Sequence, residues 1–423
     1  MLCLILFCLL TSLTAELLVV AAIPSCQASA DNPRDIVCTP GTSDYLLERG
    51  LISDNNRTTR ITLRACRITD VDFGSFSGLP ALEYLDLSQN KIVYLKLGVL
   101  DEFTQLKFFN LSHNQLTGFP LGIFDQKPNM EVLDLKGNKI TELELGIFDL
   151  MKKLRHVDVS SNALLGKEIN SYIFDQSTKI KIMDFSRNDM SDSKSILLDA
   201  FEMLEFLNLD RCLLTEVPAF ATKPNLKTTK HLILSTNKIT RLDDRALFIN
   251  LENLEILNLV DNAIEHIADK VFMSLKKLKS VLLRGNKLTQ IPDSLFQHLP
   301  KLISVDLSHN LIEFVPVNAF RGSPVKNLNL SVNRFTYLTD NFCLELRNSG
   351  GGMTKFYFNQ NPWQCACLRD ILDEVKKFGI NYNGVGYDGR TPVCVISNDF
   401  NCRRQPDANA NFVDLYYELI RGE

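Results

Sequence analysis

Cysteine and histidine carry the most specific chemistry in this chain, which holds eleven of the first and six of the second in 423 residues. Four cysteines, Cys365, Cys367, Cys394 and Cys402, fall in one short segment. Two close pairs can bind zinc, but the second pair is eight residues apart and no histidine lies beyond His309. In a secreted chain such a cluster forms disulfides. We expect Cys365 to bond Cys394 and Cys367 to bond Cys402, because cysteines two residues apart cannot easily bond each other.

The other cysteines have different roles. Cys26 and Cys38 are expected to form a disulfide near the N-terminus. Cys66 and Cys212 take a repeat position that is otherwise held by asparagine, and we interpret them as small buried residues. Cys343 has no evident partner, so three alternatives stay open: it is free, joins the C-terminal bonding, or bridges to another chain.

Known catalytic patterns are not found in the sequence. The histidines are scattered without H-E-x-x-H spacing, and neither a G-x-S-x-G elbow nor a phosphate-binding loop occurs. A set of aspartates at one repeat position could do acid–base chemistry or hold calcium, but we interpret it as a solvated strand face. We therefore expect no enzyme, no cofactor and no metal site. The aspartates are Asp86, Asp134, Asp158, Asp184 and Asp306.

The N-terminal residues predict export from the cell. Residues 1–22 form an apolar run typical of a secretory signal peptide, although Glu16 interrupts it and no Lys or Arg precedes it. The alternatives are an uncleaved anchor or a mis-assigned start, and cleavage after Ala30 instead of Ala22 would remove Cys26. No second long apolar segment and no C-terminal lipid-anchor signal follow. We expect a secreted protein in the extracellular space, with no membrane span after signal cleavage.

Self-similarity indicates the fold. LEYLDLSQNKI (82–92), LKFFNLSHNQL (106–116) and MEVLDLKGNKI (130–140) fit the pattern L-x-x-L-x-L-x-x-N-x-L. The alternation L-x-L predicts a short strand with one buried face, and the asparagine can satisfy backbone groups where the chain turns away. Its position recurs in thirteen units, mostly 23 to 26 residues apart. These positions are Cys66, Asn90, Asn114, Asn138, Asn162, Asn188, Cys212, Asn237, Asn262, Asn286, Asn310, Asn333 and Asn361.

The predicted fold is an α/β solenoid, a leucine-rich-repeat horseshoe with a parallel β-sheet on its concave face and disulfide-bonded caps. Many units have a phenylalanine further downstream, such as Phe124, Phe148 and Phe272, and these side chains are expected to fill the core. The last unit leads into NPWQCAC, where Trp363 is expected to close the core, and residues 368–378 have helical spacing. We predict a signal peptide (1–22), an N-terminal cap (23–57), repeats (58–361), a cysteine-rich C-terminal cap (362–402) and a tail (403–423).

These motifs resemble those of extracellular leucine-rich-repeat proteins, most closely Toll-receptor ectodomains and the leucine-rich immune proteins secreted into insect haemolymph. The resemblance covers roughly residues 58 to 402 and is specific for architecture rather than function. It implies a binding protein. The chain departs from Toll receptors by lacking a membrane span and signalling domain, and from the best-known secreted members by lacking a long C-terminal coiled coil. Direct signalling and coiled-coil pairing are therefore not carried over to this chain.

The strands offer a candidate binding surface. In eight consecutive units, the residue before the second strand leucine is mostly apolar or aromatic, which is more than solubility requires. The alternative is that flanking loops cover this file as part of the core. Ile233, Val260 and Leu282 extend it. The eight residues are Tyr84, Phe108, Val132, His156, Ile182, Phe206, His231 and Ile256, and the partner-binding candidates are Tyr84, Phe108, His156, Ile182, Phe206, Ile256 and Leu282.

Asn56, Asn110 and Asn329 fit the N-glycosylation sequon, and the last two would face the concave side. Glycans there would restrict a ligand to units four to eleven or to a lateral edge. The net charge of −4 gives no basis for nucleic-acid binding.

Two functions are consistent with these features. The first is a secreted protein that binds an extracellular protein ligand or co-receptor, in innate immune recognition or cell adhesion. The second is a structural matrix or self-assembling component, a homo- or hetero-oligomer that could be linked through Cys343.

Overall fold

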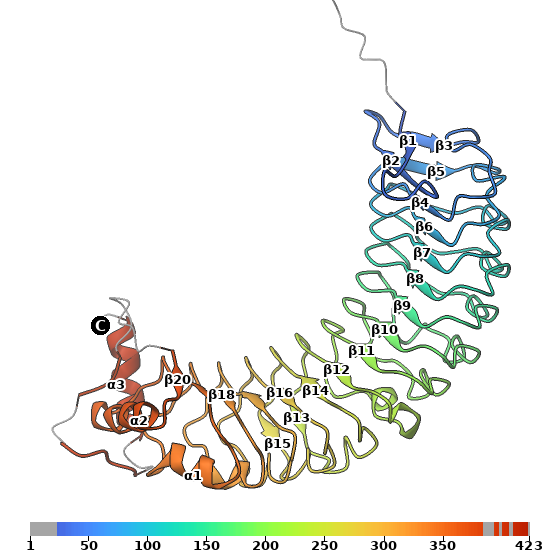
Figure 1. Ribbon diagram of the computed structural model, residues 1–423. Helices are drawn as coiled ribbons and strands as arrows, with labels where there is room; N and C mark the ends of the chain where they lie inside the picture. The colour runs from blue at the N-terminus through green and yellow to red at the C-terminus, as the bar shows by residue number, and fades with distance from the viewer. Residues whose placement is uncertain (1–22, 384–392, 397–399, 406–408, 422–423) are drawn as a thin grey trace, which may run out of the picture.

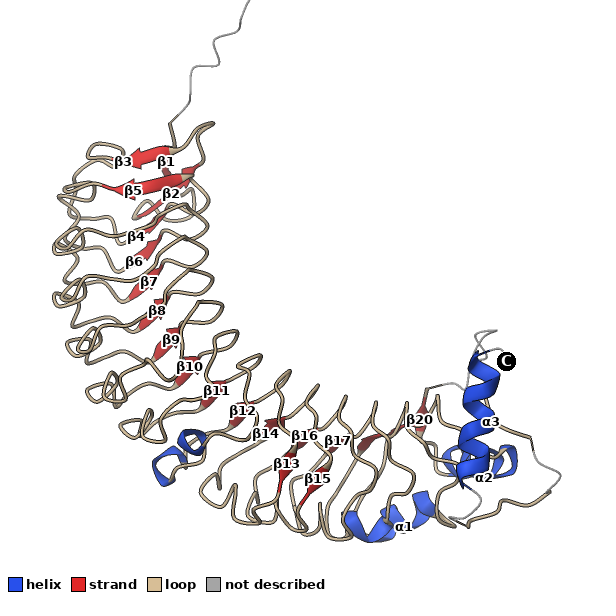
Figure 2. Ribbon diagram, turned by 180° about the vertical axis from the view of Figure 1, so that it is seen from behind, coloured by secondary structure: helices blue, strands red, loops and turns tan. Residues whose placement is uncertain are grey.

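The computed structural model describes residues 23–383, 393–396, 400–405 and 409–421. The predicted signal peptide lies outside these residues. The strands follow one another along the inner side of an arc, and turns form its outer side (Figure 1). Figure 2 shows that the long helices gather at the C-terminal end. The horseshoe solenoid expected from the repeats is therefore confirmed.

Sixteen strands of the described chain form one sheet, in which every neighbouring pair is parallel except β1 and β2. The thirteen strands from β4 to β19 in this sheet belong to the thirteen predicted units. In order, the strands are β1 (Ser25–Ala28), β2 (Asp35–Thr39), β4 (Arg60–Thr62), β6 (Tyr84–Asp86), β7 (Phe108–Asn110), β8 (Val132–Asp134), β9 (His156–Asp158), β10 (Ile182–Asp184), β11 (Phe206–Asn208), β12 (His231–Ile233), β14 (Ile256–Asn258), β16 (Ser280–Leu282), β17 (Ser304–Asp306), β18 (Asn327–Asn329), β19 (Lys355–Tyr357) and β20 (Asn381–Tyr382).

Shorter elements complete the units. Strand β3 (Tyr45–Leu47) pairs with β5 (Ile68–Val71), and β13 (Arg241–Leu242) pairs with β15 (His266–Ile267). Short 3-10 helices occupy outer turns: η1 (Ala219–Ala221), η2 (Pro224–Leu226) and η3 (Val317–Phe320).

Leucines and phenylalanines form one continuous core, as the pattern predicts. The central residue of each strand, such as Leu85 or Leu257, is fully buried because its side chain points away from the concave surface. On the opposite side, phenylalanine rings of successive units stack, with centroids 6.0 Å apart for Phe248 and Phe272 and 6.1 Å apart for Phe272 and Phe296. Each unit therefore buries its apolar residues against its neighbours.

The repeated asparagines form a hydrogen-bonded ladder. The Asn114 amide donates to the carbonyl oxygens of Leu87, at 2.9 Å, and Leu111, at 3.0 Å. Its Oδ1 accepts a 3.0 Å hydrogen bond from the Ile92 amide. Leu87 and Ile92 belong to the preceding unit. The asparagine therefore satisfies buried backbone groups across the boundary between two units.

Cys66 and Cys212 occupy this ladder, as expected. The Cys66 thiol donates to the Cys38 carbonyl at 3.8 Å, and the Cys212 thiol donates to the Phe185 carbonyl at 3.4 Å. Both side chains are fully buried. Burial raises the pKa of Cys66 to about 11 and that of Cys212 to about 12, so both thiols stay protonated at neutral pH.

The residue before each ladder position has a left-handed backbone conformation. It is glycine in two units, Gly137 and Gly285, but other residue types in most, including Thr236 with φ 53° and Val332 with φ 54°. A β-branched side chain is strained in this region. The tight turn that aims the ladder asparagine into the solenoid requires the conformation whatever the residue.

Disulfides close both ends. Cys26 and Cys38 lie opposite each other in the β1–β2 hairpin and are bonded. At the other end, Cys365 is bonded to Cys394 and Cys367 to Cys402, which is the pairing expected from the spacing. The disulfides therefore hold the described cap segments against the solenoid.

Helices complete the C-terminal cap. Helix α1 (Phe342–Asn348) lies in the twelfth unit and α2 (Cys365–Lys377) covers the last one, beginning three residues before its predicted start. Trp363 is buried, and its Nε1 donates to the Phe358 carbonyl at 2.8 Å. The tryptophan thus belongs to the core, as the sequence indicates.

The segment expected as a tail is packed against the cap. It contains α3 (Asn409–Arg421), in which Asn409, Val413 and Tyr416 are buried. Arg404 pairs with Asp370 at 2.7 Å, which ties the chain before α3 to α2. The structural cap thus extends beyond residue 402.

Cys343 is buried in α1, and its thiol is free. Burial, and then the nearby Glu374 carboxylate, raise the pKa of this thiol. Of the three alternatives, the structure favours the free thiol over a bridge within the cap or between chains.

Candidate protein-binding surface on the concave sheet

Strand pairing places the eight predicted residues in one line across the sheet. Tyr84 pairs with Phe108, Phe108 with Val132, and the same register continues to Ile256. We call these eight residues the apolar file. Each is at least partly exposed, and Ile182 is 36% exposed. Flanking loops therefore do not cover the file as part of the core.

Polar residues continue the same line towards the C-terminus. Ser280, Ser304 and Asn327 take the equivalent position in β16, β17 and β18. The fold thus accepts polar side chains at this position. The six aliphatic or aromatic residues of the file, which are joined by His156 and His231, are therefore not required by the architecture.

An aromatic stack forms the N-terminal end of the file. The rings of Tyr84 and Phe108 are 4.3 Å apart and inclined by 5°. The Arg60 guanidinium lies 3.4 Å from the centroid of the Tyr84 ring. Stacked rings and a cation–π contact hold these three side chains in fixed positions, which lowers the entropy lost when a partner binds.

The aspartates of the next line have a structural role. Each accepts a hydrogen bond from the backbone amide two residues later, as Asp134 Oδ1 does from Lys136 at 3.0 Å and Asp158 Oδ1 from Ser160 at 2.8 Å. Asn110, Asn208 and Asn329 accept the same bond. The aspartate set is therefore a series of Asx turns that end the strands.

Burial raises the pKa of Asp134 and Asp158, because a carboxylate on the sheet loses part of its hydration. Within the described residues, no group of three or more His, Cys, Asp or Glu side chains is arranged to hold a metal ion. The interpretation as a solvated strand face is thus incomplete, since the carboxylates also cap the turns.

Four units have another residue type at this position, and in two of them it is aliphatic. Ile233 and Leu282 take the position of the turn-forming aspartate, and an aliphatic side chain cannot accept the hydrogen bond. Both are partly exposed, as are Ile256 and Val260 between them. Together with Ile256, the last residue of the apolar file, Ile233, Val260 and Leu282 extend the apolar surface at the C-terminal end of the file, with Asn258 between Ile233 and Leu282 in their line. Leu282 therefore lies on the same face as the other partner-binding candidates, but in the neighbouring line.

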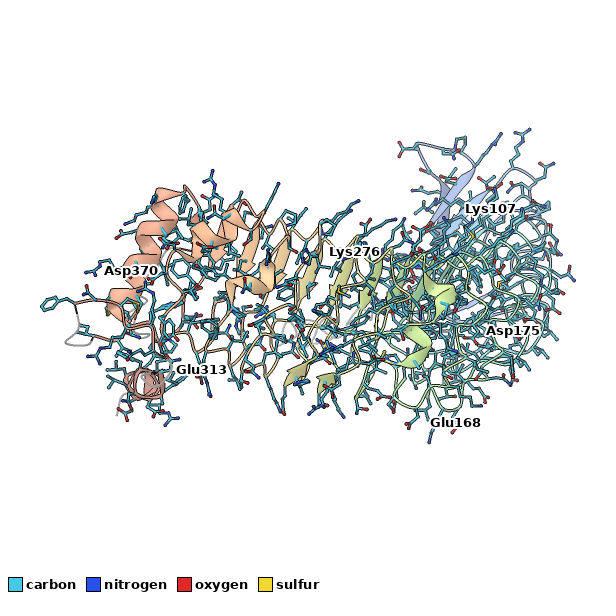
Figure 3. All side chains as sticks on the ribbon, turned by 90° about the horizontal axis from the view of Figure 1, so that it is seen from below. Lys107, Glu168, Asp175, Lys276, Glu313 and Asp370 are labelled. Carbon is cyan, nitrogen blue, oxygen red and sulfur yellow. A yellow bond between two sulfur atoms is a disulfide. The ribbon has the colours of Figure 1, made fainter. Side chains whose placement is uncertain are left out.

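A charged line borders the apolar file on its other side. Lys107 pairs with Glu83 at 2.8 Å, and Glu205 pairs with both Lys181, at 3.1 Å, and Lys230, at 2.6 Å. Lys230, and then Lys181, lower the pKa of Glu205. Figure 3 shows Lys107 and Glu168 at opposite edges of the solenoid. The members of this charged line are Glu83, Lys107, Glu131, Arg155, Lys181, Glu205, Lys230, Glu255 and Lys279.

A hollow of about 610 Å³ lies over strands β9 to β12, where the arc bends in Figure 1. Ile182 and Phe206 form its apolar floor, and the Phe206 ring meets the His231 ring edge-on at 5.9 Å. Two histidines, two lysines and two carboxylates surround this floor. The full lining is His156, Lys181, Ile182, Asp184, Glu205, Phe206, Lys230 and His231.

Sequence reasoning found the floor of the hollow but missed its charged wall. Lys181, Glu205 and Lys230 each stand directly before a strand. The signal was present, because Glu and Lys or Arg alternate at this position from Glu83 to Arg155. Alternating charges in neighbouring parallel strands meet as ion pairs.

The three sequons differ in exposure. Asn56 is exposed, whereas Asn110 and Asn329 are partly buried on the concave sheet at the places expected from their position in the strands. Their Oδ1 atoms accept hydrogen bonds from Ser112, at 2.9 Å, and Ser331, at 3.1 Å. Their glycosylation stays a prediction.

Comparisons with known proteins agree with this architecture. A sequence model described as leucine rich repeat matches residues 56–116, 109–164, 224–288 and 276–335. A search of curated protein sequences gave no match. None of the helices in the described chain has the length and apolar character needed to cross a membrane.

Solved structures share the fold at low identity. A chain of the glycosylated Drosophila Toll–Spatzle complex has a TM-score of 0.62 and 22% identity, covering 87% of this chain and 52% of that chain. The LRIM1/APL1C complex gives 0.59 and 18%, covering 86% and 63%. The APL1 leucine-rich repeat domain gives 0.57 and 19%, covering 80% and 85%.

This chain spans about half the length of the matched chain in the Toll–Spatzle complex. Identities below a quarter establish the fold alone. The sequence match covers more than half of the chain, and the strands, asparagine ladder and caps continue the same architecture in the other described residues. The chain belongs to the leucine-rich-repeat family.

Proposed function

We propose that this chain is an extracellular recognition protein that binds another protein through its concave sheet, with the contact centred on the hollow over β9 to β12. The observation that carries the proposal is the apolar file. Its side chains are partly exposed, and the fold accepts serine or asparagine at the same position in later units. Apolar surface beyond the needs of folding is typical of binding sites.

The surroundings of the file suit a protein partner. Aromatic and aliphatic side chains in the middle are bordered by charged residues, which is the usual arrangement of an apolar interface core within a polar rim. The Lys181–Glu205–Lys230 ion pairs hold the wall of the hollow in place. A partner side chain that displaces water from the Phe206 floor would be oriented by these charges.

Three disulfides support an extracellular location, because such bonds persist in oxidising compartments. The neighbours add support for the class of function, since Toll–Spatzle is described as a hub of development and innate immunity, and LRIM1 and APL1C form a complex. We therefore infer a role in innate immune recognition. Burial of Cys343 gives no support to covalent self-assembly through that residue.

The experiment is affinity capture from extracellular fluid, followed by measurement of Kd with each purified partner. The variant Ile182→Ser/Phe206→Ser removes the floor of the hollow, and we expect at least about tenfold weaker binding from the lost apolar contacts. The matched control Ser280→Ala/Ser304→Ala changes the same line where it is polar, and it should bind like the wild type. A second variant, Phe108→Ala/Phe206→Ala, tests whether the aromatic stack also contributes.

Thermal unfolding of every variant checks that the fold is kept. Equal recovery and equal Kd for all partners with wild type and both apolar-file variants would refute the concave surface as the binding site. Expression in secreting cells tests location: we expect the protein in the medium, with an N-terminus at Ile23, and retention in the cell would contradict it.

A further inference from the structure

A second apolar feature lies outside the concave surface. Phe73, Leu97, Leu121 and Leu145 recur at one position in the outer turns of units one to four, each directly before a glycine. Their exposed fractions are 59%, 54%, 58% and 51%. Scattered exposed apolar residues are normal, but a large apolar residue at the same exposed position in four neighbouring units is not.

The four side chains form a continuous ridge. An ideal Cβ position at Gly98 would be 3.6 Å from Phe73 Cε1. The corresponding Cβ position at Gly122 would be 3.6 Å from Leu97 Cδ1. Each side chain thus lies across the glycine of the next unit. The next unit has Tyr172 at the glycine position and the buried Ser171 before it, so the ridge ends there. We call Phe73, Leu97, Leu121 and Leu145 the convex ridge.

Carboxylates run along one flank of the ridge. The Oδ2 atoms of Asp101, Asp125 and Asp149 lie 3.6 Å, 3.4 Å and 3.7 Å from the Cβ places at Gly98, Gly122 and Gly146. Among the described residues, none of these three aspartates forms an ion pair. Figure 3 shows Asp175, which follows in the same line, between the two edges of the solenoid.

The other flank has carboxylates only in the first and the fourth unit. Asp70, Asp72, Glu142 and Glu144 lie in the chain just before the ridge residues of their units. The single basic residue there is Lys96, which is already paired with Asp70 at 3.1 Å and Asp72 at 3.2 Å. The ridge is therefore an apolar line with one continuous acidic border, formed by Asp101, Asp125 and Asp149.

We propose that the convex ridge binds a cationic segment of a partner protein, in which apolar side chains alternate with Lys or Arg. Apolar side chains of the segment pack on the leucines, and its cations face Asp101, Asp125 and Asp149. Opposite charges at the border select such a segment, since an acidic peptide or an anionic lipid surface is repelled. The site is separate from the concave surface, so a partner can occupy each independently.

A labelled synthetic peptide of alternating Leu and Lys tests this chemistry by fluorescence anisotropy. The variant Leu97→Gln/Leu121→Gln should bind it about tenfold or more weakly, because the two leucines together lose at least that factor of apolar contact. The matched control Ile249→Gln removes an apolar residue that is 60% exposed in an outer turn of the eighth unit, and it should leave the affinity unchanged.

The variant Asp101→Asn/Asp125→Asn/Asp149→Asn should bind the peptide more weakly and with a shallower dependence on salt. It keeps the ridge, so it tests charge even if the leucine variant folds poorly. Equal affinities of wild type and both ridge variants would overturn the proposal. So would equal binding of a Leu–Glu peptide, or a loss of affinity confined to the concave variant Asp134→Asn/Asp158→Asn.

Discussion

Lys127 provides the sharpest test of the packing described above. It stands in the third unit where the neighbouring units have Phe103 and Met151, two core residues. Its exposed fraction is 0%, and its Nζ has no hydrogen-bond partner in the described structure. The substitution Lys127→Met places an apolar residue of similar length in the same space. We expect it to stabilise the protein, because a buried unpaired ammonium is costly.

The magnitude follows from the pKa. Burial lowers the pKa of Lys127 from its ordinary value of 10.5 to about 8, against a smaller opposing effect of Asp101. This shift corresponds to a penalty of about 3 kcal/mol for keeping the charge in the folded state. Below the folded pKa both states carry the proton, so the penalty is present in full. Between the two values only the unfolded chain is protonated, so stability rises with pH.

Denaturant unfolding at pH 7 and at pH 10 measures this difference. The free energy of unfolding of Lys127→Met should exceed that of the wild type by about 3 kcal/mol at pH 7, and the gap should narrow by about 2 kcal/mol at pH 10. The control Lys276→Met changes an exposed lysine that donates to the His298 carbonyl at 3.0 Å, and its difference from the wild type should not depend on pH. A Lys127→Met protein less stable than the wild type, or a gap of constant size, would refute the reasoning.

Three further predictions concern the ladder and the thiols. Asn114→Ala should lower the unfolding free energy by about 3 kcal/mol or more, as measured by denaturant unfolding, because it leaves buried backbone groups unpaired. Val332→Gly should raise it by about 1 kcal/mol by relieving a left-handed β-branched residue, and a loss of stability in the same assay would contradict the strain. Cys66, Cys212 and Cys343 should resist iodoacetamide at neutral pH until denaturant is added, which mass spectrometry detects; rapid labelling of the folded protein would contradict their burial.

The sequence predicted the features that the repeat imposes on every unit. The strands and the ladder asparagines follow from the repeat spacing, because a solenoid places equivalent residues in equivalent surroundings, and the cap disulfides follow from the clustering of their cysteines. Features that depend on one unit were harder to predict. Lysine is a residue type that usually lies on the surface, and the burial of Lys127 is evident only from its alignment with Phe103 and Met151. The burial of Cys343 depends on the packing of α1 against α2, which spacing does not show.

The candidate surface was predicted in outline. The apolar file follows from the period of two, whereas the turn-capping role of Asp134 and Asp158 depends on the backbone conformation after the strand. Residues 403–423 were predicted only as a tail, with no helix assigned, although Val413 and Tyr416 have helical spacing and are buried in α3. An amphipathic segment outside the repeat gave a weaker signal than the repeat itself.

The asparagine ladder gives the solenoid a direction. Each asparagine serves the unit before it, as Asn114 does for Leu87 and Ile92, so a unit is complete only when its successor is in place. During synthesis from the N-terminus, folding must therefore lag one repeat behind the emerging chain. A shortened protein can begin at any unit whose exposed core is covered by a cap. Its last unit must be followed by a segment with a side-chain amide that takes the place of the next ladder asparagine. In this chain Asn361 closes the twelfth unit, and the Oδ1 of Asn383 accepts a hydrogen bond from the Phe358 amide of the thirteenth.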